Sequence, residues 1–149
     1  MKKQRLSVRA YSAAMIDGEG TITLSYDDKK SRFRHPEVSV SSTTPELTKI
    51  MKTWWKGSIS GKRIYKRKHS PSTDWRVSRD NAICFLSQVV TYLKEPEKLR
   101  RAKMILFEYS KLTQRNGKYS AGEVAKKLNF EKKFFANSKR VWKQHELRS

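Results

Sequence analysis

One stretch near the amino terminus, residues 11–20 (YSAAMIDGEG), constrains the chain more than any other because it joins a helix to a strand through charged residues. Small and apolar residues favour a helix, Asp17 and Glu19 alternate with Gly18 and Gly20, and the alternating residues TITL follow at once. The last carbonyl groups of a helix have no partner within it and lie at its partly negative end. A carboxylate beside glycine backbone there makes an oxygen-rich corner that suits a hard divalent cation. The same residues also form an ordinary helix stop and turn, so this stretch alone supports both interpretations equally.

The charge of the chain points to a polyanionic partner. Its 149 residues carry 34 Lys and Arg against 14 Asp and Glu, a net charge of +20. A charge of this size says little about the fold but favours binding to nucleic acid. The cations are spread along the sequence, and no window is apolar enough to span a membrane, so we expect nucleic acid and no membrane as the partner. A basic RNA-binding protein would share this charge, so charge alone does not decide between the two nucleic acids.

The remaining composition bears on location and metal chemistry. No secretory hydrophobic segment follows the first residues, and the single Cys84 excludes an internal disulfide. We therefore expect an intracellular protein of the cytoplasm, nucleoid or an organelle matrix, and not a secreted one. The three histidines are far apart in the sequence and match no zinc-ligand spacing.

Hydrophobic periodicity predicts the secondary structure. The predicted strands cover residues 21–26, 37–41, 58–68 and 74–78. The predicted helices cover residues 7–16, about 44–56, a segment containing Ile83, Leu86, Val90 and Leu93, residues 97–112 and about 120–145. In the first strand Ile22, Leu24 and Tyr26 should face a core, and in the last strand Trp75 and Val77 should do so. Capping boxes are expected where a hydroxyl residue precedes a glutamate by three positions, at Thr43 with Glu46 and at Ser120 with Glu123.

This order of elements, α-β-β-α-β-β-α-α, predicts an α+β fold. We expect a four-stranded antiparallel sheet whose apolar face is covered by helices and whose other face is polar. Residues 1–113 should form the core. Residues 114–149 should form a linker and a basic C-terminal helical extension, either within the same domain or accessory to it.

The uncovered face of the predicted sheet would carry hydroxyl groups and cations. A polar outer face is ordinary for an antiparallel sheet, but here cations also cluster at the tips of both hairpins. These hairpin cations are Lys29, Lys30, Arg32 and Arg34 in the first hairpin and Lys62, Arg63, Lys66 and Arg67 in the second. The outward-facing strand residues are Thr23, Ser25, Ser39, Ser41, Arg76 and Ser78. We predict that both sets contact DNA, because a two-stranded ribbon fits the major groove and arginine, here Arg76, pairs bidentately with guanine.

The motif at residues 12–20 and the element order behind it resemble the LAGLIDADG homing endonucleases. The match is partial: Ser12 stands for the leading Leu of the pattern, Ala14 for the first Gly, Gly18 for the second Ala and Glu19 for the second acid. The resemblance in element order covers about residues 7–112. Residues 96–102 (PEKLRRA) are similar to the lysine-bearing start of the helix that follows the core in single-motif members. The tail beyond residue 114 matches no motif.

The resemblance implies a metal-dependent DNA endonuclease. Glu19 would bind Mg²⁺, or another divalent cation such as Mn²⁺, with the carbonyl of Gly18 assisting, and the metals would activate water and stabilise the leaving oxygen. Lys98 would lie in the basic pocket around the site. Ser42 falls where members carry a polar side chain that positions water, and Asp17 corresponds to the first, mainly structural, acid.

The chain holds one copy of the motif, which resembles the homodimeric members, in which two motif helices pack across a two-fold axis. The predicted dimer-interface residues are Ala10, Ala13, Ala14 and Asp17. The implied substrate is a long, pseudo-palindromic double-stranded DNA site of which each subunit cuts one strand.

The alternative is a non-catalytic binder of the same fold, either an intron RNA maturase or a DNA-binding regulator. An unrelated basic RNA-binding protein is disfavoured by the motif and the element order, and an enzyme is favoured because a pure binder needs no acid facing phosphates.

Overall fold

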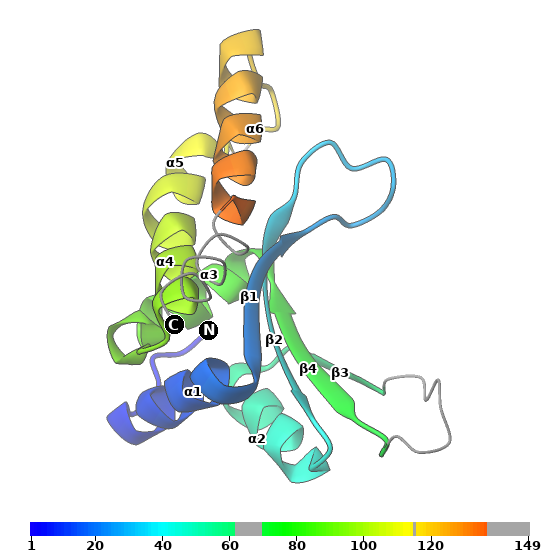
Figure 1. Cartoon of the computed structure of the whole chain (residues 1–149), viewed down its shortest axis with the longest axis vertical. Coiled ribbons are helices and arrows are strands. Elements are labelled where there is room, and N and C mark those ends of the chain that lie inside the picture. The colour runs from blue at the N-terminus through cyan, green and yellow to red at the C-terminus, as the bar shows by residue number, and fades with distance from the viewer. Residues whose placement is uncertain (62–69, 115, 137–149) are drawn as a thin grey trace, which may run out of the picture.

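The computed structural model describes residues 1–61, 70–114 and 116–136. Four strands form one antiparallel sheet in the order β1-β2-β4-β3 (Figure 1). The strands are β1 (Gly20–Ser25), β2 (His35–Ser42), β3 (Ser58–Gly61) and β4 (Thr73–Ser78). The helices are α1 (Leu6–Glu19), α2 (Pro45–Trp55), α3 (Arg79–Val89), η1 (Val90–Tyr92), α4 (Pro96–Met104), η2 (Ile105–Tyr109), α5 (Ser110–Leu112) and α6 (Ala121–Phe135).

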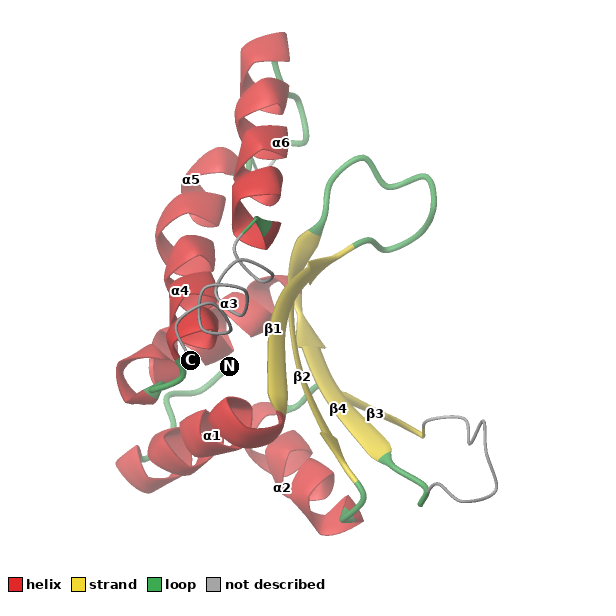
Figure 2. Ribbon diagram, in the orientation of Figure 1, coloured by secondary structure: helices red, strands yellow, loops and turns green. Residues whose placement is uncertain are grey.

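The helices lie on one face of the sheet and leave the other face open (Figure 2). Alternate strand residues, among them Val38, Val40 and Trp75, are fully buried beneath the helices, which is what period-two alternation of apolar side chains requires. The predicted α+β class and its four-stranded antiparallel sheet are therefore confirmed. Within the described residues, no helix is both long and apolar enough to cross a bilayer.

The predicted strand faces are confirmed with one exception. Ile22, Leu24, Trp75 and Val77 are buried as expected, each with at most 4% of its surface exposed. The prediction for Tyr26 was wrong, since 46% of this residue is exposed. Strand β1 ends one residue earlier, so Tyr26 belongs to the loop that follows and is not held on the inner face.

The first helix extends further than predicted. It ends at Glu19 rather than at residue 16, so both acids of the motif lie in its last turn. Gly20 then begins β1 directly against the helix, where a Cβ atom would lie 2.6 Å from Cα of Ile16. Only glycine permits this close approach of strand to helix, so the direct junction of α1 with β1 depends on Gly20.

One predicted capping box is confirmed and the other was wrong. Ser120 caps α6, and the reciprocal bonds between its own groups and those of Glu123 are both present. Helix α2 begins after Thr44, so Thr43 is not its cap and no box forms with Glu46. The helix instead ends in a turn at Gly57, whose φ of +84° and 2.4 Å approach of a would-be Cβ to the Arg76 carbonyl oxygen both require glycine.

The predicted helix over residues 97–112 forms a continuous helical segment, α4, η2 and α5, in which η2 is a π-helical turn. Beyond it, α6 adds Phe130 and Phe134 to the hydrophobic core. The predicted second strand of the distal hairpin is confirmed as β4, and β3 pairs with it over residues 58–61. The rest of the predicted first arm lies outside the described residues.

Candidate active site and nucleic-acid interface

The carboxyl end of α1 is joined to the start of α4 by two side chains. The Asp17 carboxylate accepts hydrogen bonds from the backbone N–H groups of Lys94 (2.9 Å) and Glu95 (3.1 Å). In return, Nζ of Lys98 donates to the carbonyl oxygens of Ile16 and Asp17, both at 2.8 Å. A cation is favourable there because the last carbonyls of a helix lie at its partly negative end. The structure thus places the predicted Lys98 against the motif helix, and Asp17 joins α1 to the start of α4 within the protomer.

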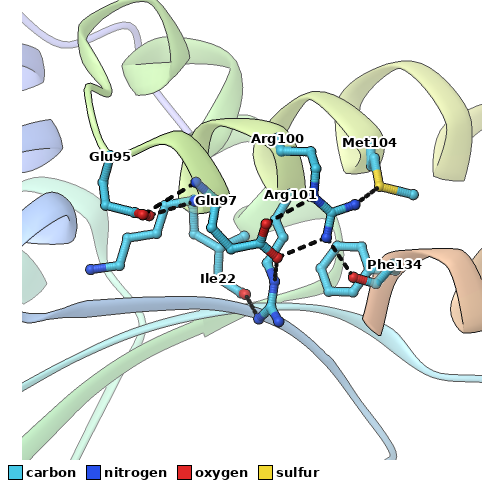
Figure 3. A network of polar contacts seen from close by, with 8 residues as sticks. Ile22, Glu95, Glu97, Arg100, Arg101, Met104 and Phe134 are labelled. Carbon is cyan, nitrogen blue, oxygen red and sulfur yellow. Dashed lines mark hydrogen bonds and ion pairs between the residues drawn. The ribbon is translucent and has the colours of Figure 1, made fainter. Parts of the chain in front are cut away.

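The two acids at the start of α4 also have hydrogen-bond or ion-pair partners. Glu95 caps the helix by accepting from the N–H groups of Glu97 (3.2 Å) and Lys98 (2.7 Å). The Glu97 carboxylate lies between two guanidinium groups, with Nη2 of Arg100 at 2.7 Å and Nε of Arg101 at 3.0 Å (Figure 3). The hydrogen bond from Arg100 lowers the pKa of Glu97 below its usual value, with partial burial acting in the opposite sense and Arg101 helping to lower it.

The same two arginines connect α4 to the elements on either side. Nη1 of Arg101 donates to the carbonyl oxygen of Ile22 in β1 at 2.9 Å, and Nη2 of Arg100 donates to that of Phe134 at 2.8 Å (Figure 3). Phe134 lies at the carboxyl end of α6, where a guanidinium group compensates unpaired carbonyls. Helix α4 therefore holds the motif helix, the edge of the sheet and α6 in one arrangement.

Glu19 differs from these acids. Its side chain is exposed, and among the described residues its carboxylate makes no hydrogen bond or ion pair. Gly18 beside it is also exposed, and a Cβ atom there would meet no atom of the described residues within 4 Å. No cluster of three or more His, Cys, Asp or Glu that could hold a metal occurs in the described part of the chain. A metal at this corner would therefore rely on Glu19, backbone oxygen, water and a substrate phosphate, which is a donor set that Mg²⁺ accepts.

Ser42 lies at the same end of the sheet, with its hydroxyl oxygen bonded to the chain just before α2. Val40 pairs with Gly20, so the end of β2 that carries Ser42 runs beside the end of α1. Its hydroxyl oxygen accepts the backbone N–H of Thr44 at 3.0 Å, which turns it toward the start of α2. The structure therefore places Ser42 near the corner with its hydroxyl already engaged.

The predicted strand contacts to DNA share the open face of the sheet. Thr21, Ser39, Arg76 and Ser58 form a row across all four strands. The predicted contacts of this face alternate with the buried residues of the same strands and are Thr23, Ser25, Ser39, Ser41, Arg76 and Ser78. The tertiary structure thus brings together residues from three strands that are far apart in the sequence.

Two acids on this face were not counted among the predicted contacts. Glu37 accepts a hydrogen bond from the Ser25 hydroxyl at 2.9 Å and lies 3.5 Å from Nε of Arg76. Asp74, which is buried, binds the hydroxyl of Ser41. The sequence held the signal for Glu37, because it has the same strand parity as the two outward-facing serines of β2. Arg76 is therefore held by a carboxylate while its side chain remains 47% exposed.

The cations of the loop between β1 and β2 fall into two groups. Lys29, Lys30 and Arg32 are exposed, as expected of residues that contact a partner. Arg34 is engaged with α6: its N–H donates to Glu131 at 2.8 Å and its guanidinium lies 3.3 Å from the same carboxylate. The predicted cations of the second hairpin lie outside the described residues and are Lys62, Arg63, Lys66 and Arg67.

The predicted dimer-interface residues differ in how exposed they are. Ala10 and Ala14 are exposed on α1, and Gly18 continues the same stripe at a spacing of four residues. Ala13 is fully buried in the core of its own protomer. It faces the sheet because α1 packs on β1 and β2, which the sequence of the helix alone does not reveal. Of the predicted interface residues, Ala10 and Ala14 are therefore the ones exposed to a second chain.

The fold has well-defined relatives among solved structures. No protein-family model matches the chain, and no curated protein matches its sequence. The homing endonuclease I-CvuI, in complex with its target in the presence of Ca, matches with a TM-score of 0.66 and 15% identity over 86% of this chain and 80% of that one. The homing endonuclease I-TnaI matches with a TM-score of 0.58 and 14% identity over 91% and 93%.

A third solved structure is described as a LAGLIDADG homing endonuclease. The LAGLIDADG homing endonuclease I-GzeII, in complex with its DNA target, matches with a TM-score of 0.60 and 14% identity. The match covers 92% of this chain but 48% of I-GzeII, so the chain spans about half of that protein. Identities this low establish the fold alone, and at that level the predicted resemblance is confirmed. The chain has the fold of the LAGLIDADG homing endonucleases.

Proposed function

We propose that the chain is a site-specific, divalent-metal-dependent endonuclease that cuts both strands of a pseudo-palindromic DNA site as a homodimer. The observation that carries this proposal is the carboxylate of Glu19. Asp17, Glu95 and Glu97 at the same corner are bound to backbone or arginine groups, whereas Glu19 is exposed and has no partner among the described residues. An acid kept free at the end of an open, polar sheet face, in a chain of net charge +20, is suited to a cation that is shared with phosphate.

The residues at the corner have separate roles in this proposal. Glu19 and the Gly18 carbonyl would hold Mg²⁺ or Mn²⁺, which when bound activates water and stabilises the leaving oxygen of phosphodiester hydrolysis. Lys98 has three N–H donors, of which the carbonyls of α1 take two, so one remains for a phosphate oxygen or a water. Asp17 keeps α4, and therefore Lys98, in place against the motif helix.

The open face of the sheet would read the duplex. Solved relatives of this fold are homing endonucleases bound to DNA, which supports duplex DNA as the partner. On this face Arg76 would pair with a guanine, and Glu37 would orient its guanidinium from below. The exposed loop cations would contact phosphates and so set the affinity rather than the sequence preference.

A homodimer is supported by α1. The exposed stripe of Ala10, Ala14 and Gly18 is small enough for another helix to approach closely. Glycine within a helix costs about 0.5–1 kcal/mol relative to alanine, and no contact among the described residues requires it at position 18. A partner helix packed against the stripe would account for that residue and would bring two Glu19 side chains to one site.

Cleavage of a DNA library with Mg²⁺ and with EDTA tests the proposal. We expect double-strand cuts at one class of site with Mg²⁺ only, and Glu19→Gln should abolish cutting while leaving binding intact. Glu108→Gln is the matched control, since it makes the same change at a surface ion pair on η2. Cutting by Glu19→Gln at the wild-type rate would refute the assigned role of this acid.

The same experiment separates the alternative function. Specific binding of duplex DNA without any metal-dependent cutting would make the chain a DNA-binding regulator. Specific binding of intron RNA in preference to duplex DNA would make it a maturase of the same fold. The catalytic proposal is favoured over both because neither binder needs an unpaired acid at the end of α1.

A further inference from the structure

Two charged residues on one face of α6 are almost completely buried. Lys127 is 3% exposed and Glu131 is 5% exposed, and their spacing of four residues places them side by side on the helix. Charged side chains are buried this completely only when other groups compensate them. The compensating groups identify what this face of α6 does.

The groups around Lys127 come partly from the loop between β1 and β2. Its Nζ donates to the hydroxyl of Thr113 at 2.8 Å and lies 5.1 Å from the ring centre of Phe33, 4.8 Å from that of Tyr109 and 5.2 Å from that of Tyr119. Ammonium groups are attracted to aromatic faces at such distances, more strongly where water is excluded. Phe33 belongs to the β1–β2 loop, so Lys127 attaches this loop to the helical layer.

Glu131 holds the same loop at the point where it enters β2. It accepts the backbone N–H of Arg34 and also binds the guanidinium group. That guanidinium lies 4.5 Å from the ring centre of Tyr26, at the beginning of the loop, and 4.9 Å from that of Phe135 in α6. The end of the loop at Arg34 is thereby attached to α6, which stands beside the loop (Figure 1), and the same guanidinium connects it to Tyr26 at the other end.

Helix α6 is itself held in place by the hydrophobic core and by α4. Its Phe130 and Phe134 lie in the core, and the carbonyl of Phe134 is bound by Arg100 of α4 (Figure 3). Between its attached ends the loop carries three exposed cations, Lys29, Lys30 and Arg32, and two exposed acids. Of these acids, Asp27 binds the guanidinium of Arg79 in α3, and Asp28 accepts the backbone N–H of Lys30 within the loop. The loop is therefore fixed at its ends and presents charge at its tip.

We propose that α6 is a brace that sets the conformation of the β1–β2 loop before DNA binds, with Lys127 and Glu131 as positioning residues for recognition. A loop ordered in advance loses less conformational freedom on binding, so its contacts contribute more fully to affinity and specificity. Strand β1 separates this loop from the Glu19 corner by roughly 17 Å, which corresponds to about five base-pair steps of B-DNA. The brace therefore acts on base pairs at the outer part of each half-site. This consequence for DNA rests on the proposed function, whereas the attachment of the loop does not.

Hydrogen exchange of the full-length free protein tests the attachment without DNA. We expect amides of residues 27–34 to exchange about tenfold faster in Glu131→Gln, which loses a charge-assisted bond, and in Lys127→Met. Lys126→Met and Glu46→Gln make the same changes at exposed positions and should leave the loop unchanged. Slow exchange of amides in β2 and β4 shows that a variant is folded. If Lys127→Met does not fold, Glu131→Gln alone still tests whether α6 holds the loop. Unchanged loop exchange in a folded Glu131→Gln would overturn the proposal.

Selection of bound sequences from a randomised duplex library tests the consequence for recognition. We expect the brace variants to lose preference about five or more base pairs from the cleavage positions and to keep it closer in. A uniform loss over the whole site would contradict a brace and indicate general destabilisation. If the wild-type chain bound no duplex at all, the proposed function would fall while the exchange result stood.

Discussion

Replacing Ser12 should destabilise the motif helix more than an ordinary serine-to-alanine change. Ser12 is fully buried, and its hydroxyl oxygen accepts the indole N–H of Trp55 at 2.8 Å. Trp55 is also fully buried and packs edge-to-face on Phe85, with ring centres 4.7 Å apart. In Ser12→Ala the indole N–H would remain buried without a partner, which costs about 1–3 kcal/mol. For a domain of this size that loss lowers the melting temperature by roughly 2–12 °C.

Urea denaturation and thermal melting measure this effect. Ser7→Ala, at an exposed position of the same helix, is the control and should change the free energy of unfolding by about 0.5 kcal/mol or less. The double variant Ser12→Ala/Trp55→Phe removes donor and acceptor together, so it should be more stable than the sum of the single changes predicts, by about 0.5–3 kcal/mol. Additive single effects would refute the argument that this hydrogen bond stabilises the junction of α1 with α2.

The same hydrogen bond accounts for one departure of residues 12–20 from the LAGLIDADG pattern. Ser12 occupies the position of the leading Leu, and the departure is matched by a donor on α2. Ser12→Leu would introduce the residue of the LAGLIDADG pattern but should destabilise the protein further than Ser12→Ala. A larger side chain would be forced into a packed core while the indole N–H still lacked a partner.

Three further predictions concern the junction, pH and salt. Gly20→Ala should destabilise the protein by about 1–3 kcal/mol in urea denaturation, because the added Cβ meets backbone of Ile16, whereas Gly18→Ala should leave the monomer as stable or raise its stability. The lowered pKa of Glu97 means that its contribution to stability is present above the usual value near 4.5 and is lost as pH falls through the folded-state value. Glu97→Gln should therefore lose less stability than wild type between about pH 6 and pH 3, and identical profiles would contradict this. If about 8 phosphates are contacted, log K for duplex DNA should fall with log salt at a slope of about −7, measured by fluorescence anisotropy.

The sequence was sufficient for the order of elements and for most strand faces. Period-two alternation requires only neighbouring residues, and it correctly placed Trp75 and Val77 on the buried face of β4. The capping box of Ser120 with Glu123 is equally local and was found in the same way. Tyr26 was misplaced because a strand end depends on pairing with β2, and alternation continues in the sequence past the last paired residue.

At the candidate site, too, the sequence predicted some features and only the structure showed the others. The motif identified Asp17, Gly18 and Glu19, and the basic segment identified Lys98, without any structure. The resemblance implied a metal-binding Glu19 and a structural Asp17, but the groups that tie Asp17, the backbone N–H groups of Lys94 and Glu95 about eighty residues away, are known only from the tertiary structure. It also counted Ala13 as available to a partner, whereas packing on the sheet buries this residue in its own protomer.

By itself, the sequence determined the classes of residue and their local geometry: a helix ending in acids, a strand pair with basic tips and a large positive charge. Those properties depend on residues within a few positions of one another, so composition and periodicity contain them. Tertiary structure alone decided the partners of each group. The indole of Trp55 meets Ser12, and Lys127 and Glu131 hold the loop between β1 and β2, because elements distant in sequence pack together. The same packing ties Asp17 and leaves Glu19 exposed at the corner, the arrangement on which the proposed chemistry depends.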